Sequence, residues 1–265
     1  MKKRYGSTLA LAVLVVSLGA CTSGSDTSGA AATSAVATTD PSSTPMVLDL
    51  TPTIMDILAG KAEPFTDLEP GTYAIDPDLD PSTPLRVTWE IPAGGWKSWI
   101  GAGKFSDAGW VSVSITTVSN LVTHGCRDHS WADPPVGPSV EDLTTSLADL
   151  APFRVTSPPE DVSIDGYGGT HLELTVPELP VEGAGIDTHF TNCAEGNLKS
   201  WVAAIDAGEE GDAFYGYTGP GYREEFWILD VEGTRLMIAA ERSPGSPPED
   251  LDEQRAILDS IRIEP

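Results

Sequence analysis

The segment from His124 to His129 holds the densest group of side chains in this chain that could do chemistry. It reads His-Gly-Cys-Arg-Asp-His, so two imidazoles, a thiol and a carboxylate lie close together. Such groups bind metals or act as bases toward a hydroxyl such as that of Ser130. A structural zinc site needs paired ligand spacing and a second cluster, and a hydrolase needs an oxyanion loop; neither pattern is found here. We therefore expect neither a metal site nor a catalytic site here. The alternative function is a secreted cell-envelope hydrolase whose site contains His124, Asp128 and His129.

A second acidic pattern has the beginning of a calcium loop but not its end. Asp76, Asp78 and Asp80 alternate as calcium ligands do, yet Pro81 stands where the turn glycine belongs and Val87 where the closing acid belongs. The chain also has no Gly-x-Ser-x-Gly elbow, phosphate-binding glycine loop or His-Glu-x-x-His motif. The sequence thus predicts no cofactor and no catalytic activity.

Aromatic side chains give the stronger functional signal. Trp96 and Trp99 lie at a predicted hairpin, and Tyr217 and Tyr222 lie in a loop rich in Gly and Pro that could present their rings outward. Buried Trp usually belongs to a core, but exposed rings with little charge nearby are typical of binding surfaces. We hypothesise a binding face formed by these four residues, with an envelope protein, a glycan or an apolar molecule as the ligand.

The N-terminus combines a basic start with a short apolar run. Lys2, Lys3 and Arg4 precede about ten apolar residues, too few for a bilayer that needs about twenty. The run ends in Leu18-Gly19-Ala20-Cys21, and the whole pattern closely resembles the lipobox of bacterial lipoproteins. That resemblance implies removal of residues 1–20, diacylglycerol on the Cys21 thiol and acylation, as with palmitate, of the new amino terminus. An ordinary secretion signal with a chance cysteine is the alternative.

The segment that begins at Cys21 and the net charge of the chain indicate how such a protein would be placed at the membrane. Residues 21–45 consist almost wholly of Ser, Thr, Ala, Gly, Pro and Asp after the cysteine, which predicts a disordered tether. The net charge of −25 repels nucleic acid and anionic lipid headgroups. We expect no nucleic-acid partner, and contact with the membrane only through the lipid anchor, on the side facing away from the cytoplasm.

The cysteine count predicts a disulfide. The chain has three cysteines, and if Cys21 carries lipid, Cys126 and Cys193 remain. An oxidising exterior favours a bridge between them. Metal ligation by Cys126 with its neighbouring histidines is the competing interpretation.

Alternating and helical patterns predict the fold. We expect residues 46–84 to form an N-terminal extension and residues 85–265 to form one globular domain of antiparallel sheet flanked by helices, an α+β fold. The predicted strands and hairpins are 85–91, 96–99, 110–116, 161–176, 226–231, 235–240 and 261–263, and the predicted helices are 140–150 and 248–260.

The order of these elements carries a further resemblance. IPAGGWKSW, a capped helix, DGYGG, WILDVEGTRLMIAA and a terminal helix ending in ILDSIRI follow one another over residues 85–263. This order resembles the PsbP-like fold, and especially the LpqN-type lipoproteins of actinobacteria. The resemblance implies an α/β/α sandwich in a group of proteins that mostly bind or assemble without chemistry of their own. The sequence thus predicts a lipid-anchored binding or interaction module.

Overall fold

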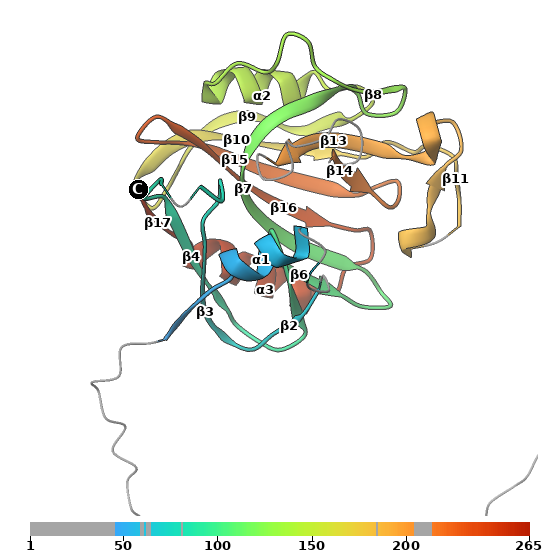
Figure 1. The fold of residues 1–265 in the computed structure, drawn as a ribbon. Coiled ribbons are helices and arrows are strands. Elements are labelled where there is room, and N and C mark those ends of the chain that lie inside the picture. The colour runs from blue at the N-terminus through green and yellow to red at the C-terminus, as the bar shows by residue number, and fades with distance from the viewer. Residues whose placement is uncertain (1–45, 59–60, 62–64, 81, 184, 204–213) are drawn as a thin grey trace, which may run out of the picture. The chain divides into compact units, whose positions relative to one another are not determined.

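Antiparallel β-sheet dominates the described part of the protein, and three α-helices pack against it (Figure 1). The computed structural model describes residues 46–58, 61, 65–80, 82–183, 185–203 and 214–265. The predicted signal peptide, Cys21 and the tether lie outside these residues. The prediction of antiparallel sheet with few helices is confirmed, and the architecture is consistent with an α+β or a mainly-β fold. None of the described helices has the length and apolarity needed to cross a membrane.

The larger sheet has eleven strands. They are β2 (Asp67–Leu68), β5 (Trp96–Trp99), β6 (Gly101–Phe105), β7 (Trp110–His124), β8 (Asp128–Trp131), β9 (Arg154–Ile164), β10 (Tyr167–Thr175), β13 (Leu198–Ala203), β14 (Phe214–Tyr217), β15 (Arg223–Val231) and β16 (Thr234–Arg242). The main path runs β2-β5-β6-β7-β16-β15-β10-β9, while β8 and the β13–β14 pair join the far half of β7. The predicted strand over 110–116 is therefore the first half of a much longer one.

The N-terminal segment is built into the sheets. Residues 46–84 supply the helix α1 (Thr51–Leu58) and three strands, although we expected them to form an extension. One of these strands is β2, and the other two belong to a four-stranded sheet of order β1-β3-β4-β17. Its strands are β1 (Val47–Asp49), β3 (Gly71–Ile75), β4 (Arg86–Ile91) and β17 (Arg262–Glu264). A third sheet pairs β11 (Val181–Glu182) with β12 (His189–Phe190), outside the predicted strands.

The two longer helices form where the sequence predicts them. The helix α2 (Val140–Ala148) begins at Ser139, whose hydroxyl and the carboxylate of Asp142 form a capping box. The helix α3 (Pro248–Ser260) begins with proline, whose missing N–H costs nothing at that position. Both helices bury side chains against the sheets, mainly apolar ones in α2 and a mixture of polar and apolar ones in α3, and this packing stabilises them more than their intrinsic propensity does.

The helices α2 and α3 cover opposite faces of the larger sheet (Figure 1). Arg235 of β16 donates to the carbonyl of Ser139 at the start of α2, 3.2 Å away. Lys104 of β6 forms an ion pair with Asp250 of α3 at 2.7 Å. Since side chains two positions apart share a face, Arg235 marks one face and Lys104 the other. We call them the α2 face and the α3 face.

Both faces of the central strands are buried, as their continuous apolar runs predict. On β15, Phe226 and Ile228 point to the α2 face and Trp227 and Leu229 to the α3 face, and all four are buried. On β7 the polar side of the alternating pattern is also buried on the α2 face, including Ser112. Buried polar groups need hydrogen-bond partners, so the polar side chains buried on this face are candidates for a functional site.

Candidate functional site

Two glutamates lie side by side on the α2 face. Glu224 of β15 is the register partner of Glu241 of β16, and their exposures are 2% and 4%. The two-residue turn at Glu232 and Gly233 fixes this register, and both turn residues have positive φ. Side chains directly opposite on antiparallel strands have their Cβ atoms about 5 Å apart. The fold therefore holds two carboxyl groups together in its interior.

Glu224 is oriented by the β13–β14 hairpin, which lies over this part of the face. The indole Nε1 of Trp201 donates to Glu224 Oε1 at 3.2 Å, and the phenol of Tyr217 donates to Oε2. The Tyr217 hydroxyl also lies 3.1 Å from the hydroxyl of Ser200. These donors are neutral, so they orient the carboxyl group without adding a positive charge to it.

Glu241 has a similar pair of neutral donors. The indole Nε1 of Trp110 donates to Glu241 Oε2 at 2.7 Å, and the phenol of Tyr215 donates to the same oxygen at 2.6 Å. Among the described residues no donor reaches the other oxygen, Oε1. The Tyr215 ring stacks on Trp201 with centroids 4.6 Å apart, which joins the donors of the two acids into one packed group.

Burial changes the acid–base behaviour of this group. Loss of hydration raises the pKa of Glu224 to about 8, with repulsion from Glu241 as the next cause. Loss of hydration likewise raises the pKa of Glu241 to about 7. The pKa values of Tyr215 and Tyr217 are raised well above the usual phenol value, again mainly by burial. Carboxyl groups that titrate near neutral pH are typical of functional sites.

A buried hydroxyl next to the acids has no partner. Ser112 of β7 is the register partner of both Gly103 and Glu241, so its side chain lies on the α2 face between them. It is 1% exposed, and its Oγ makes no hydrogen bond. Native interiors rarely leave such a group unsatisfied, because its lost hydration costs about 1–3 kcal/mol.

Four partly exposed rings continue from this group along the edge of the face. Centroids lie 5.1 Å apart for Trp99 and Phe65, 5.1 Å for Phe65 and Phe105, and 3.9 Å for Phe105 and Trp110. Phe105 is 38% exposed, and the buried Nε1 of Trp99 has no hydrogen-bond partner. We call these four residues the aromatic row.

We call the adjoining interior group the carboxyl–aromatic site. It consists of Glu224, Glu241, Ser112, Trp110 and Tyr215. Trp110 belongs to both the site and the aromatic row, which connects the buried acids to rings that reach the surface.

The predicted tyrosines lie at this site, but not in the orientation expected. Tyr217 is 5% exposed, so the expectation that its ring faces outward is wrong. Its hydroxyl is instead drawn inward to Glu224. Tyr222 is partly buried, and its hydroxyl lies 2.8 Å from that of Thr218. Burial is the main cause that raises the Tyr222 pKa, and the charge of Glu241 adds to it.

The two predicted tryptophans are separated by the sheet. Trp99 belongs to the aromatic row on the α2 face, as described. Trp96 is fully buried and donates from its Nε1 to Glu253 of α3 at 2.9 Å, so it lies on the α3 face. Trp96 and Trp99 are three positions apart along β5, and this odd offset places them on opposite sides of the strand, because successive side chains alternate. The structure therefore does not bring the four predicted binding residues onto one surface.

The predicted disulfide is present. The Sγ atoms of Cys126 and Cys193 are 2.10 Å apart. Cys126 packs in a small apolar cluster that also contains Val176, Phe190 and Tyr217. The bridge thus connects the turn after β7 to the segment that precedes β13, next to Tyr217, which donates to Glu224 of the site.

The two histidines near the disulfide form hydrogen bonds with the backbone of the turn that follows β7. His124 Nδ1 accepts from two backbone N–H groups of the turn, each at 3.1 Å. His129 Nε2 lies 3.0 Å from the carbonyl of Gly125, and Asp128 accepts from the backbone and hydroxyl of Ser130. Among the described residues no hydrogen bond joins the three side chains of the alternative hydrolase site. The described residues also contain no cluster of three or more metal-ligating side chains.

The calcium-like aspartates are likewise used within the protein. Asp76 is buried and its Oδ2 forms an ion pair with Arg86 at 2.8 Å. Burial raises the pKa of Asp76 to about 6. Asp78 accepts from the hydroxyl of Thr83, and Asp80 accepts from the chain that follows it. A hydrogen bond with Asp78 is the next cause that raises the Asp76 pKa, so these two carboxyl groups interact with each other as well as with their separate partners.

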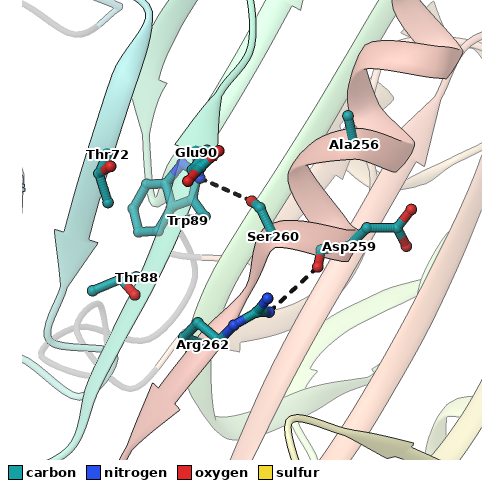
Figure 2. Close-up of a pocket in the computed structure, with 8 residues that line it drawn as sticks. All are labelled: Thr72, Thr88, Trp89, Glu90, Ala256, Asp259, Ser260 and Arg262. Carbon is teal, nitrogen blue, oxygen red and sulfur yellow. Dashed lines mark hydrogen bonds between the residues drawn. The ribbon is translucent and has the colours of Figure 1, made fainter. Parts of the chain in front are cut away.

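A pocket of about 480 Å³ lies elsewhere, between β4 and the end of α3 (Figure 2). Ser260 accepts from the backbone N–H of Glu90 at 2.8 Å, and Arg262 donates to the carbonyl of Asp259 at 3.4 Å. Trp89 also lines this pocket, and its buried indole Nε1 has no hydrogen-bond partner among the described residues (Figure 2).

Comparisons with known proteins do not place the chain in a family. No family model matches it. A D-aminoacyl-tRNA deacylase of Methanosphaerula palustris is 29% identical to it over 104 residues. That alignment covers 38% of this chain and 22% of the deacylase, so the chain spans less than a quarter of that protein's length. A similarity of this extent carries no activity over to the present protein.

The acids of the site have a signal in the sequence, although the sequence reasoning did not find them. Glu224 and Glu241 stand just outside the two apolar runs predicted as paired strands. Extending that hairpin by a few residues brings them opposite each other. Ser112 gives no such signal, because its lack of a partner depends on what packs over the sheet.

Proposed function

We propose that this protein is a lipid-anchored binding module without catalytic activity, outside the cytoplasmic membrane, whose small polar ligand binds at the carboxyl–aromatic site. The observation that carries the proposal is the unpartnered hydroxyl of Ser112, which is buried beside Glu241. A ligand that hydrogen-bonds this hydroxyl would remove the cost of its burial.

The aromatic row supports the same site. Its rings are only partly covered, and they lead from the surface to Trp110, which contacts Glu241. Binding sites for small molecules combine such apolar rings with a few placed polar groups. The tryptophans here would report binding through a change in intrinsic fluorescence.

A specific fold family is also part of the proposal. We propose a PsbP-like α/β/α sandwich, and the opposite placement of α2 and α3 on the larger sheet supports it. The group that this fold resembles mostly binds or assembles partners, which agrees with a binding module. The resemblance alone names no ligand.

The anchor is tested by replacing the cysteine of the lipobox-like motif. The Cys21→Ser variant is expected to leave the membrane fraction, because the thiol that would carry diacylglycerol is gone. Cell fractionation followed by mass measurement of the N-terminal peptide checks this result. A wild-type protein found in the soluble fraction, with an unmodified Cys21, would contradict the proposed anchor.

The site is tested by removing the unpartnered hydroxyl. For Ser112→Ala we expect an unfolding free energy that is unchanged or higher by about 1 kcal/mol, since the hydroxyl gains nothing in the free protein. The melting temperature is measured with defined monosaccharides, amines, amino acids and fatty acids. At least one class should raise it for the wild type and raise it less for Ser112→Ala.

Two outcomes would count against the site. If no class of compound raised the melting temperature of the wild type, the proposed binding function would fail. If Ser112→Ala were strongly destabilised without ligand, the hydroxyl would have a structural role instead. Asp107→Asn is the matched control, because Asp107 is exposed in the turn between β6 and β7 and should respond to ligands as the wild type does.

A further inference from the structure

Most buried acidic side chains in the described part of the protein form an ion pair with a basic side chain, and two do not. The described part buries five carboxyl groups, and three of these have a cation 2.6 to 2.8 Å away. These three pairs are Asp76 with Arg86, Glu173 with Arg242, and Asp250 with Lys104. Among the described residues, no salt bridge reaches Glu224 or Glu241. In the described part of the chain, the two buried acids that lie side by side are thus the two without an ion pair.

Neutral donors do not replace the missing cation. Among the described residues, Glu224 and Glu241 accept only from indole and phenol groups. Such bonds orient a carboxylate, but a buried pair of negative charges still costs several kcal/mol without an opposite charge. A positive group at this position would therefore gain more than it gains at any of the three acids that already have a partner.

Unused hydrogen-bonding positions lie on two residues that face each other across neighbouring strands, Glu241 and Ser112. Both donors of Glu241 reach Oε2, so Oε1 has no donor among the described residues. The register partner of Glu241 on β7 is Ser112, which is 1% exposed. Its buried hydroxyl has no hydrogen-bond partner in the described part of the chain. An ammonium group has three N–H donors and could reach both of these oxygens at once. A neutral alcohol has only one donor.

The surrounding rings suit the same chemistry. The rings of Trp110 and Phe105 are in contact, and Trp110 and Tyr215 both donate to Glu241. Aromatic faces attract cations and also cover the alkyl part of an organic ammonium ion. The net charge of −25 further favours the approach of cations over anions.

We propose that the ligand of the carboxyl–aromatic site is a small organic ammonium ion, whose N–H groups donate to Glu241 and Ser112 while its alkyl part lies against Trp110 and Phe105. This inference rests on the proposed binding function and names the class of ligand. No bond is formed or broken in the ligand. When the ion binds, it favours the ionised carboxylates.

Proton release is the signature that separates this role from a structural one. Burial raises the pKa values of both acids, so the free pair retains a proton near neutral pH. A bound cation lowers those pKa values and expels that proton. Up to about one proton per bound cation is expected at pH 7, and calorimetry in two buffers with different ionisation enthalpies measures it.

The experiment compares n-butylammonium with 1-butanol, which has a similar shape and no charge, and with glucose, using the full-length protein. We expect saturable binding of n-butylammonium with proton release, and binding of 1-butanol at least tenfold weaker. Glu241→Gln and Ser112→Ala should each weaken n-butylammonium binding about tenfold, as expected for a lost charged hydrogen bond. Asp107→Asn removes one nearby charge without touching the pair and should bind as the wild type does.

The other results would each overturn a different statement. Equal or tighter binding of 1-butanol or glucose would overturn the ammonium ligand and leave the proposed binding function standing. Binding of n-butylammonium that Glu241→Gln and Ser112→Ala do not weaken would place the cation elsewhere and overturn the inference. If no compound of any class bound, the inference and the proposed function would fall together.

Discussion

Replacing both Cys126 and Cys193 by alanine is expected to lower the free energy of unfolding by about 4 kcal/mol. The bridge closes a loop with a sequence separation of 67, and a cross-link over such a loop restricts the unfolded chain strongly. For a protein of this size the change corresponds to a melting temperature lower by roughly 10 °C. Thermal unfolding followed by circular dichroism measures it.

The bridge should also influence the binding site. Cys126 packs in the same small cluster as Tyr217, which donates to Glu224. We therefore expect loss of the bridge to weaken ligand binding as well as stability. Cys21→Ser is the control for the loss of a cysteine, and its unfolding free energy should equal that of the wild type. An alanine pair with unchanged stability would show that the bridge does not limit the unfolded chain.

The sequence predicts best those elements whose signals are local. The capping pair Ser139 and Asp142 identifies the start of α2, and the apolar run before Glu232 identifies β15. In each case the residues that decide the structure lie within one turn or one strand. Residues 46–84 were misjudged because β1, β2 and β3 are short, and their pairing partners on other strands lie outside the local pattern.

The site was harder to predict because it depends on which faces become covered. The alternation of β7 from Trp110 to Thr116 predicts one polar face, but not that β13 and β14 would pack over the acids beneath it. Tyr217 was expected outside because its neighbours are Gly and Pro. Its inward orientation follows from Glu224, which needs a donor once it is buried.

The carboxyl pair predicts that stability falls as pH rises from about 5 to about 8. Glu224 and Glu241 have pKa values raised in the folded protein, to about 8 and about 7, above the value of about 4.3 for an exposed Glu. Between these limits the folded state binds more protons than the unfolded state. Its advantage is therefore complete below the unfolded pKa and is lost as pH passes the folded pKa.

Other shifted groups do not reverse this sign. Asp76 and His171 also have raised pKa values, so their contributions fall in the same direction. Groups with lowered pKa values, such as Glu225, lose their contribution only at more acidic pH. All of these groups are kept when only the pair is replaced, so the difference between variants isolates Glu224 and Glu241.

The Glu224→Gln/Glu241→Gln double variant should accordingly lose most of this pH dependence. Near pH 5 the wild-type pair is protonated, so the two proteins should unfold with similar free energies. Near pH 8 the variant should be more stable by about 2 kcal/mol or more, because it has no buried charge to form. Urea unfolding at both pH values measures the difference, with Asp107→Asn expected to follow the wild type. If wild-type stability were constant or rose over this range, the pair would already be ionised, and a positive charge within the free protein would have to compensate it.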